Sequence, residues 1–266
     1  MRICSFGDVH GNIAALRAVL EAIGALEPDL VCCTGDVVLG WDGPEACVDA
    51  VAALGCPWVS GNAEQSVLEA GPYRLPPESG RGRNAAWDRA RLGPERLRRL
   101  GALPAAVALR FPEGTGVLLV HGAPPDRITP GIRPTGLHEW NDVLDDAAVA
   151  AALGPEPPDL VLCGHTHVPT VRRIGPSLVV NAGSTGYGIH PDAPARYRTG
   201  NAWARFAVIE RDGGGTWRAV CRRVPYDAEA SLARLAEAPW AGPAGARERG
   251  AFLRAPAAAP GPDPVG

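Results

Sequence analysis

The stretch RICSFGDVHGNIAALRAVLEAI, residues 2–23, combines a short apolar run, a polar loop and a helical pattern. The run RICSF has the length and composition of a β-strand. From Asn12 to Leu26, apolar residues recur every three or four positions, which is typical of a helix with one buried face. A strand followed by an amphipathic helix is the repeating unit of α/β folds, so this stretch predicts the fold class.

Further units of this kind follow along the chain. Strands are expected at DLVCCT (29–34), CPWVS (56–60), GVLLV (116–120) and DLVLC (159–163). Helices are expected to begin at Pro44 and to lie around Asp142 to Leu153, which implies parallel crossovers in a layered α/β fold. Four later runs without long helices between them indicate an antiparallel portion, expected as a second sheet packed on the first. These runs are PTVRRI (169–174), SLVVN (177–181), ARFAVIE (204–210) and WRAVCRRV (217–224).

The composition indicates a globular protein with a sizeable core. The chain has 266 residues, of which 46% are hydrophobic, and we expect residues 1–237 to form a single domain. A formal charge of −3 and an isoelectric point near 6.1 argue against a basic surface for extended nucleic-acid binding. Lysine is absent from the sequence, which excludes Schiff-base chemistry and a phosphate-loop lysine.

The sequence predicts neither a membrane protein nor an exported one. No segment reaches the roughly 18 consecutive apolar residues that span a bilayer. Met1 to Phe6 leads directly into a strand pattern without the regions of a signal peptide. The seven cysteines are odd in number and form no C-x-x-C pair, so we expect them to be small core residues. A cytoplasmic location is therefore expected.

Two regions differ from the rest of the chain. Residues 70–104 form an Arg-rich, helical insertion with seven Arg between Arg81 and Arg99. Either it packs on the sheet edge with a solvated face, or it is a lid in which Arg81 and Arg83 contact a phosphate while Tyr73 and Trp87 stack on a base. Residues 238–266 are rich in Pro, Ala and Gly and are expected to form a mobile tail.

Side chains that can bind metal ions follow five predicted strands. Because the strands of an open α/β sheet present their carboxyl ends at one edge, the loops that carry these side chains are expected to meet in one crevice. A single Asp in such a loop is usually a helix cap or a turn residue. Seven such residues in five loops are harder to explain in that way. They are Asp8 and His10, Asp36, Asn62, His121, and His165 with His167.

The order of these motifs, D-x-H, G-D, G-N, H and G-H-x-H, resembles the calcineurin-like metallophosphoesterase superfamily. The glycines of the second, third and fifth motifs are Gly35, Gly61 and Gly164, and the segments LVHGAPPD (119–126) and VVNAGSTG (179–186) also match. The resemblance covers residues 1 to about 210 and points to the small bacterial phosphodiesterase-type members. It implies a sandwich of two mixed β-sheets flanked by helices.

The resemblance also implies a pair of divalent metal ions. Asp8, His10, Asp36 and His167 would hold one ion. Asp36, Asn62, His121 and His165 would hold the other, with the Asp36 carboxylate bridging the two. Carboxylate, imidazole and amide ligands suit Mn²⁺, which we expect, and also Fe or Zn²⁺.

The expected reaction is hydrolysis of a small phosphodiester or a nucleotide. The resemblance implies that a hydroxide bridging the ions attacks phosphorus, with Asp36 and His121 as catalytic residues and Asn62 also contacting the substrate. Three alternatives remain open. The first is a phosphomonoesterase acting on protein or small molecules, the second is a noncatalytic interaction module of the same fold, and the third is an α/β-hydrolase nucleophile elbow at Ser184 in AGSTG.

The sequence departs from the family pattern at Ala63. Many members have His directly after the G-N asparagine, where the family assigns it to protonating the leaving group. Alanine cannot donate a proton, so either the leaving group is already a weak base or another residue replaces the acid. His190 in GYGIHPD is the candidate for that role, whereas His138 is expected to be an ordinary surface or interface residue. The sequence does not predict the oligomeric state.

Overall fold

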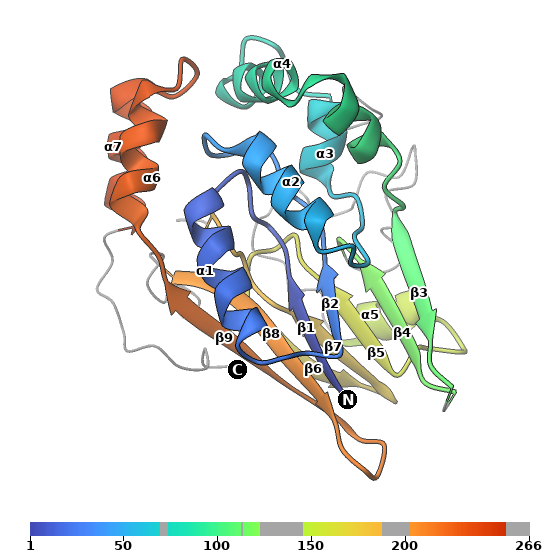
Figure 1. Cartoon of the computed structure of the whole chain (residues 1–266). Helices are drawn as coiled ribbons and strands as arrows, with labels where there is room; N and C mark the ends of the chain where they lie inside the picture. Colours follow the sequence, from blue (N-terminus) through green and yellow to red (C-terminus); the bar gives the residue numbers. More distant parts are fainter. Residues whose placement is uncertain (70–73, 113, 123–145, 188–202, 254–266) are drawn as a thin grey trace.

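Two β-sheets packed face to face and flanked by helices make up the fold (Figure 1). The computed structural model describes residues 1–69, 74–112, 114–122, 146–187 and 203–253. The first half of the chain contains β1 (Arg2–Phe6), α1 (Ile13–Gly24), β2 (Leu30–Cys33), α2 (Pro44–Ala53), α3 (Asn62–Val67), α4 (Gly80–Gly101), β3 (Ala106–Arg110) and β4 (Gly116–Val120). The second half contains α5 (Asp146–Leu153), β5 (Leu160–Cys163), β6 (Thr170–Ile174), β7 (Ser177–Asn181), β8 (Trp203–Arg211), β9 (Trp217–Pro225), α6 (Ala228–Glu237) and α7 (Gly242–Leu253).

Both sheets are mixed, which confirms the predicted fold class. The first sheet has the order β2-β1-β8-β9, with β1 parallel to β2 and antiparallel to β8. The second has the order β3-β4-β5-β7-β6, in which β4, β5 and β7 run parallel between two antiparallel edge strands. The late strands do pair antiparallel, β6 with β7 and β8 with β9, as expected. They do not form a second sheet of their own, because β7 also pairs in parallel with β5. β8 and β9 complete the sheet of β1 and β2, because strand pairing depends on long-range backbone hydrogen bonds rather than on order in the chain.

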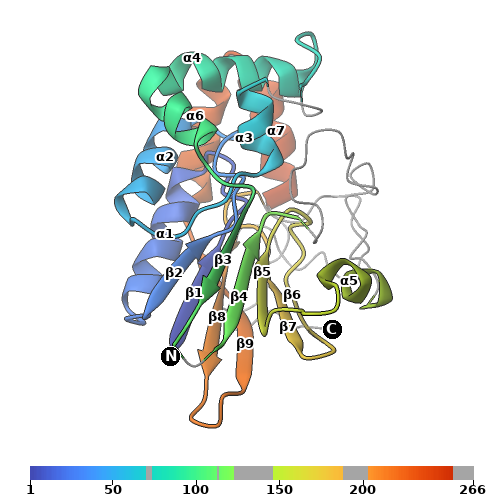
Figure 2. The same cartoon turned by 90° about the vertical axis from the view of Figure 1, so that its right-hand side faces the viewer.

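The core is divided into layers by the two sheets. Ile3 of β1 and Leu162 of β5 belong to the cluster that fills the space between the sheets. Phe6 of β1 packs in a second cluster with Leu16 of α1, on the side of the first sheet that α1 and α2 cover. Val149 of α5 packs against the outer side of the second sheet. Figure 2 shows these layers edge-on, with α1 and α2 on one side and α5 on the other.

Several sequence predictions of secondary structure need correction. The run CPWVS is not a strand, because only Trp58 forms a parallel bridge, with Cys33 at the end of β2. Pro57, which has no backbone N–H, precedes that bridge, so a longer ladder would lack a donor there. β3, α3 and α6 were not predicted from the sequence. No helix in the described residues is long and apolar enough to cross a membrane.

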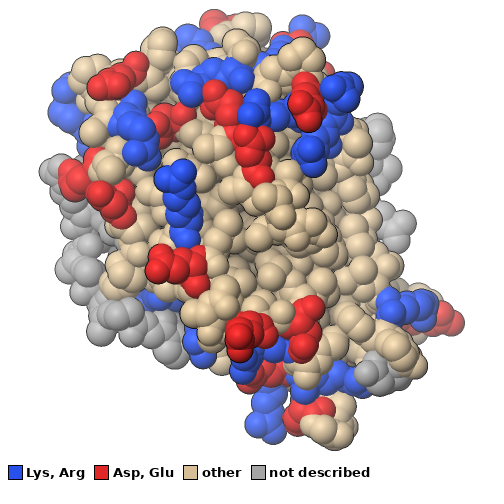
Figure 3. All heavy atoms as spheres, in the orientation of Figure 1, with Lys and Arg blue, Asp and Glu red and all other residues tan. Residues whose placement is uncertain are grey.

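The Arg-rich helix α4 packs along α2 and α3, and two of its Arg side chains pair with carboxylates of α2. Arg91 pairs with Glu45 at 2.7 Å, and Arg96 pairs with Asp49 at 2.6 Å, both of them carboxylates of α2. Figure 3, drawn in the orientation of Figure 1, shows basic and acidic side chains interleaved where these helices lie. Solvent-exposed pairs of this kind contribute little stability, but they neutralise part of the positive charge of α4.

Trp87 of α4 packs against the C-terminal region. Its ring centroid lies 6.5 Å from that of Trp240, and the guanidinium of Arg91 lies 4.6 Å from the Trp87 ring centroid. Tyr73, the other aromatic residue expected to stack on a base, lies outside the described residues. Trp87 therefore contributes to a packed aromatic cluster.

The C-terminal segment differs from the expected mobile tail, because α7 lies within it and packs on α6. Ala246 of α7 is buried in a cluster with Trp41 and Leu235, and Trp240 packs against that cluster. Alanine has the highest helix propensity, and packing of the apolar side chains stabilises such a helix in the folded protein. Residues 254–266 lie outside the described part, and the domain limit at residue 237 stays a prediction.

Truncation after residue 241 should destabilise the protein, because it uncovers the cluster of Trp41, Leu235 and Trp240. We expect the free energy of unfolding to fall by about 1–3 kcal/mol, which for a chain of this size lowers Tm by roughly 2–10 °C. Differential scanning calorimetry checks this result. Truncation after Leu253 is the reference, so that the difference between the two truncations reports on residues 242–253 alone. Equal Tm values for both truncations would contradict a packed α7.

Candidate metal centre

All seven candidate ligands lie at one end of the two sheets. Phe6 of β1 pairs with Cys33 of β2, so the loops that follow these parallel strands start side by side. The N–H of Asp8 donates to the carbonyl of Gly35 at 2.9 Å, and the N–H of His10 donates to that of Asp36 at 2.9 Å. In the second sheet, the N–H of Gly164 donates to the carbonyl of His121 at 2.8 Å. The backbone thus brings loops that are far apart in sequence into direct contact.

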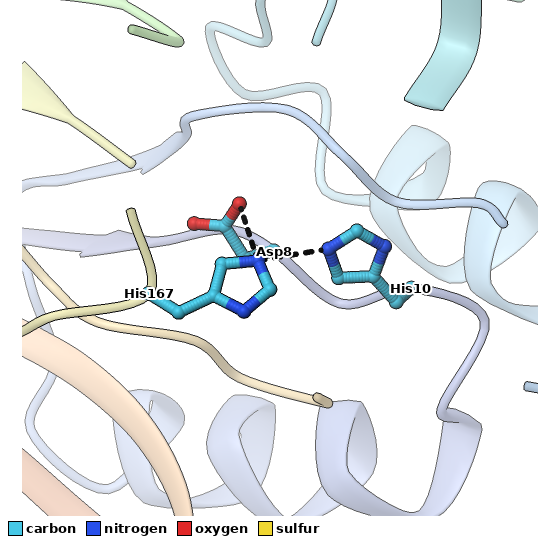
Figure 4. Close-up of side chains that lie close together, drawn as sticks. All are labelled: Asp8, His10 and His167. Atoms are coloured by element: carbon cyan, nitrogen blue, oxygen red, sulfur yellow. Dashed lines mark hydrogen bonds and ion pairs between the residues drawn. The ribbon is translucent and has the colours of Figure 1, made fainter. Parts of the chain in front are cut away.

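The first group of side chains is Asp8, His10 and His167, whose ligand atoms lie within 4.8 Å of one another (Figure 4). The Nε2 of His167 is 3.5 Å from Oδ1 of Asp8 and 3.0 Å from Nε2 of His10. All three side chains are buried. Two imidazole nitrogens and a carboxylate therefore face one small volume.

The second group is Asp36, His121 and His165, whose ligand atoms also lie within 4.8 Å of one another. The Nε2 of His121 is 3.4 Å from Oδ1 of Asp36 and 3.1 Å from Oδ1 of Asn62. The Nδ1 of His165 is 2.8 Å from the same Asn62 oxygen. The other Asp36 oxygen, Oδ2, lies 3.7 Å from Nε2 of His10. The Asp36 carboxylate therefore lies between the two groups, with one oxygen facing each.

The backbone is strained at most of these ligands. Eight non-glycine residues in the described chain have a positive φ, a conformation that costs about 1–3 kcal/mol each for side chains that prefer the right-handed region. Five of the eight are candidate ligands. They are Asp8 (51°), His10 (51°), Asp36 (53°), His165 (72°) and His167 (62°). Strain of this kind persists only where the surrounding structure compensates for it, and it concentrates at functional sites.

Two glycines of the motifs are required by close packing under the carboxylates. A Cβ at Gly61 would lie 2.1 Å from Oδ1 of Asp36, and a Cβ at Gly164 would lie 2.6 Å from Oδ2 of Asp8. Real Cβ atoms do not approach so closely. The glycines of G-N and G-H-x-H therefore let the backbone approach the carboxylates.

Hydrogen bonds to carbonyl groups orient two of the imidazoles. The Nδ1 of His10 lies 2.8 Å from the carbonyl of Leu39, and the Nδ1 of His121 lies 2.7 Å from the carbonyl of Thr34. A carbonyl oxygen only accepts, so Nδ1 carries the proton in both rings, and Nε2 faces the neighbouring ligands. Metal-binding histidines in proteins commonly make such a bond with their second nitrogen.

The charge states fit cation binding. Burial lowers the pKa of His10 and of His165 to about 4, so both rings are neutral at pH 7 and offer lone pairs. Burial acts in the opposite direction on Asp8, but its interaction with His167 lowers the pKa of the carboxyl. Burial would also lower the pKa of His121, but the charge of Asp36 outweighs it and raises that pKa to about 10. A cation bound at Nε2 of His121 would take the place of this proton.

The NAGS segment, residues 181–184, hydrogen-bonds to the loops that carry the candidate ligands. Asn181 donates to the carbonyl of Gly164 at 2.6 Å and accepts from the N–H of Gly183 at 2.8 Å. Ser184 is buried, and its hydroxyl donates to the carbonyl of Asp8 at 2.7 Å while it accepts from the N–H of Tyr187 at 2.8 Å. These bonds occupy the Ser184 hydroxyl with backbone partners, which does not fit a nucleophile elbow.

Glu64 is a buried residue of the site that the sequence analysis missed. Its carboxylate accepts hydrogen bonds from the N–H groups of Asp36 (2.9 Å), Val37 (2.6 Å) and Gly61 (2.7 Å). Burial, reinforced by the charge of Asp36, raises the pKa of Glu64 to about 7. Glu64 is the third residue of α3, where a capping-box glutamate bonds back to the residue before the helix, so the spacing from Gly61 could have indicated it.

Tyr187 is a second such residue, and no motif indicates it. Its ring centroid lies 5.0 Å from that of His10 and 5.5 Å from that of His167, in edge-to-face arrangements. The phenol ring therefore packs beside two of the three side chains in the first group.

Among the residues proposed as acid or substrate contacts, Asn62 lies in the second group of side chains. Ala63 is buried, and its N–H donates to Oδ1 of Asp36 at 2.7 Å. Arg81 and Arg83 lie in the first turn of α4, and Arg83 donates to the carbonyl of Glu78 at 2.6 Å. His190 and His138 lie outside the described residues. The roles of Arg81, Arg83 and His190 stay predictions.

Similar proteins share this fold. A metallophosphoesterase from Sphaerobacter thermophilus superposes with a TM-score of 0.70 at 23% identity, covering 95% of this chain and 98% of that one. A hypothetical protein from Pyrococcus horikoshii OT3 superposes with a TM-score of 0.69 at 18% identity, covering 88% and 91%. An uncharacterized protein of Methanocaldococcus jannaschii is 26% identical over 240 residues, which are 88% of this chain and 91% of the relative.

The family match covers most of the chain. Residues 1–199 match the calcineurin-like phosphoesterase superfamily domain, and this range includes all seven candidate ligands. The match confirms the resemblance that the motifs indicated. The chain, with its two sheets and its paired Asp and His groups, therefore belongs to the calcineurin-like phosphoesterase superfamily.

Proposed function

We propose that the protein is a phosphoesterase that depends on two divalent metal ions and hydrolyses a small phosphodiester or a nucleotide. The observation that carries the proposal is the Asp36 carboxylate, whose two oxygens face separate groups of imidazole ligands. Metal ions bound there would polarise the phosphoryl group and lower the pKa of a bound water. Asp8, His10, Asp36 and His167 would hold one ion, and Asp36, Asn62, His121 and His165 the other.

The donor types favour Mn²⁺, with Fe or Zn²⁺ as alternatives. Carboxylate, amide and imidazole ligands suit these ions, whereas softer ions prefer thiolates. Cys163 ends the strand that leads to His165, but burial raises the pKa of its thiol to about 12, so it stays protonated. The site therefore offers oxygen and nitrogen ligands.

The charges of the site favour an anionic substrate. Two divalent ions carry four positive charges, and Asp8 and Asp36 contribute two negative ones. The surplus attracts a phosphate ester. The Oδ1 of Asn62 faces two imidazoles, so its Nδ2 is the group that we propose as a donor to a phosphoryl oxygen. Arg81 and Arg83 are proposed to contact a second phosphate.

The proton for the leaving group is the open step. Ala63 has no group to donate one, so we propose either a substrate with a weakly basic leaving group, such as an aryl or pyrophosphate ester, or proton transfer from His190. If His190 is the acid, His190→Ala should slow a diester with a poor leaving group by about 10²-fold or more and an aryl diester much less. Equal rates for the variant and the wild type on both substrates would exclude His190.

A substrate panel on metal-reconstituted protein tests the proposed function. The panel compares an aryl diester, an aryl monoester, dinucleoside polyphosphates and cyclic nucleotides by kcat/KM. We expect the diester or a nucleotide to be turned over faster than the monoester, and His121→Ala to remove activity on all of them. Faster hydrolysis of the monoester would make the protein a phosphomonoesterase. Wild-type protein that retains no metal ions after reconstitution would favour a noncatalytic interaction module.

We also propose a cytoplasmic location. All seven cysteines lie among the described residues and none forms a disulfide, which is typical of proteins from reducing compartments.

A further inference from the structure

The loop that carries Asp36 contacts His10, and Leu39 is a second residue with a positive φ in this loop. Leu39 is buried and has a φ of 66°, a value that is unusual for a residue with a branched side chain. Its carbonyl lies 2.8 Å from Nδ1 of His10. The same loop closes over the backbone of His10, because the N–H of Trp41 donates to the His10 carbonyl at 2.7 Å. The position of Leu39 therefore decides the orientation of the His10 ring.

The N–H of Leu39 is held from outside the loop by α4. It donates to Oδ2 of Asp88 at 2.7 Å, and the other oxygen, Oδ1, accepts from Nδ2 of Asn84 at 3.0 Å. Asp88 is fully buried and Asn84 is nearly so. Asn84 precedes Asp88 by four residues on α4, so the two side chains lie on the same face of the helix.

Burial of the Asp88 carboxyl group at this position costs free energy. Removal from water raises the pKa of its carboxyl well above the usual range, and the backbone hydrogen bond from Leu39 opposes that shift. A buried carboxylate is tolerated where it satisfies buried donors, as it does here. An apolar side chain of the same size would avoid the cost of burial but would leave the Leu39 N–H without an acceptor.

We infer that Asp88 is a positioning residue for the metal centre, which holds Leu39 in its left-handed conformation and thereby aims Nε2 of His10 at the first ion. Asp88 fixes the peptide group before Leu39, and His10 bonds the peptide group after it, so the two contacts together restrain both backbone dihedrals of Leu39. The inference rests on the proposed function, because it concerns one of the two proposed ion sites. Through Asp88 and Leu39, α4 would thus fix the orientation of the His10 ring.

The contacts predict an asymmetric effect on the two ions. His10 belongs to the first group, whereas the ring of His121 in the second group is held by the carbonyl of Thr34, which Asp88 does not contact. Loss of an outer hydrogen bond to a metal ligand typically weakens metal affinity by about 10–100-fold. Loss of Asp88 should therefore lower the affinity for the ion at the first group and leave the affinity for the other ion nearly unchanged.

The test uses the full chain and compares three variants with the wild type and with His10→Ala, which removes a candidate ligand of the first group. Asp88→Leu has a similar size and no acceptor, whereas Asp88→Asn keeps one acceptor oxygen for Leu39. Leu92→Ala is the matched control, because Leu92 is a buried residue of the same helix whose loss destabilises the core packing without removing a hydrogen bond to Leu39. Mn²⁺ binding is measured by titration calorimetry and by electron paramagnetic resonance, which distinguishes a coupled pair of ions from a single one.

We expect the wild type to bind two ions as a coupled pair. Asp88→Leu should lower the affinity for one of the two Mn²⁺ ions about 10–100-fold and give the single-ion spectrum that His10→Ala gives. Asp88→Asn, which keeps an acceptor for Leu39, should bind both ions nearly as the wild type does. Leu92→Ala should lower Tm but keep both affinities. Wild-type affinities in Asp88→Leu, or an equal loss in Leu92→Ala, would overturn the inference. If Asp88→Leu does not fold, Asn84→Ala replaces it, because this variant removes the hydrogen bond that orients Asp88. Asn84→Ala should lower the affinity for the same ion. Unchanged affinities in Asn84→Ala would also overturn the inference.

Hydrogen exchange on the metal-free protein separates this inference from the proposed function. The Leu39 amide should exchange faster in Asp88→Leu than in the wild type. In Leu92→Ala, the exchange rate of the Leu39 amide relative to the amides next to it should stay as in the wild type. A wild type that binds neither Mn²⁺ nor Fe²⁺ nor Zn²⁺ would refute the proposed function, while the exchange rates would still report on Asp88. Unchanged protection of Leu39 in Asp88→Leu would refute the role of Asp88 even in a protein that binds two ions.

Discussion

Asp36→Asn is expected to lower kcat/KM for the best phosphoester substrate by about 10³-fold or more and to leave at most one tightly bound ion per chain. Asparagine has the same shape, and its oxygen can still accept from the N–H of Ala63, so the fold should survive. The substitution removes the negative charge from the only carboxylate among the described ligands that faces both groups. Without that charge, two cations a few ångströms apart repel each other.

Metal analysis and steady-state kinetics check this expectation on the same preparation. Asp49→Asn is a matched control, since this carboxylate lies on α2 and pairs with Arg96 at the surface. It should bind both ions and keep wild-type kcat/KM. An Asp36→Asn variant that still binds two ions with wild-type affinity would show that the carboxylate does not bridge them.

Glu64→Ala is expected to have the largest effect on stability, lowering the free energy of unfolding by about 3 kcal/mol or more. Three buried N–H groups, those of Asp36, Val37 and Gly61, would lose their acceptor, and each orphaned donor costs about 1–3 kcal/mol. Because Asp36 is one of the three, the variant should also bind metal ions more weakly. Urea unfolding at several metal concentrations measures both effects.

Two further variants frame the role of Glu64. Glu64→Gln keeps one acceptor oxygen but turns an amide group toward one N–H, so its loss of stability should be intermediate. Gln65→Ala removes a single side-chain bond to Ser60 and should cost about 1 kcal/mol. If Glu64→Ala were no more destabilising than Gln65→Ala, the three hydrogen bonds would not stabilise the loop.

The arrangement of the centre explains why its ligands could be predicted from local sequence motifs. Asp8, Asp36, His121 and His165 each follow a strand whose apolar pattern is visible in the sequence, and the loops after parallel strands in register begin together. The glycines beside them follow from the same geometry, since a Cβ at Gly61 or Gly164 would overlap a carboxylate oxygen. Local pattern and packing demand the same residues at these positions.

The residues that support the ligands were harder to predict. Asp88 and Leu39 are separated by 49 positions, and their contact exists only because α4 packs on the first sheet's helices. Trp240 likewise packs near Trp87 of α4, and Ala246 of α7 is buried in the adjoining cluster, although the Ala- and Gly-rich sequence suggested a mobile tail. Neither contact has a local signature.

The sequence by itself determined the alternation of strands and helices, the order of the seven polar side chains along the chain, and the family. These features depend on residue periodicity and short-range backbone geometry, which the chain encodes locally. Only the tertiary structure decided that β8 and β9 join the sheet of β1, that α4 braces His10 through Asp88, and that Glu64 holds the Asp36 loop. Strand partners and helix docking are chosen by backbone hydrogen bonds and apolar surfaces that many sequences share, so they become specific only when the whole core is assembled.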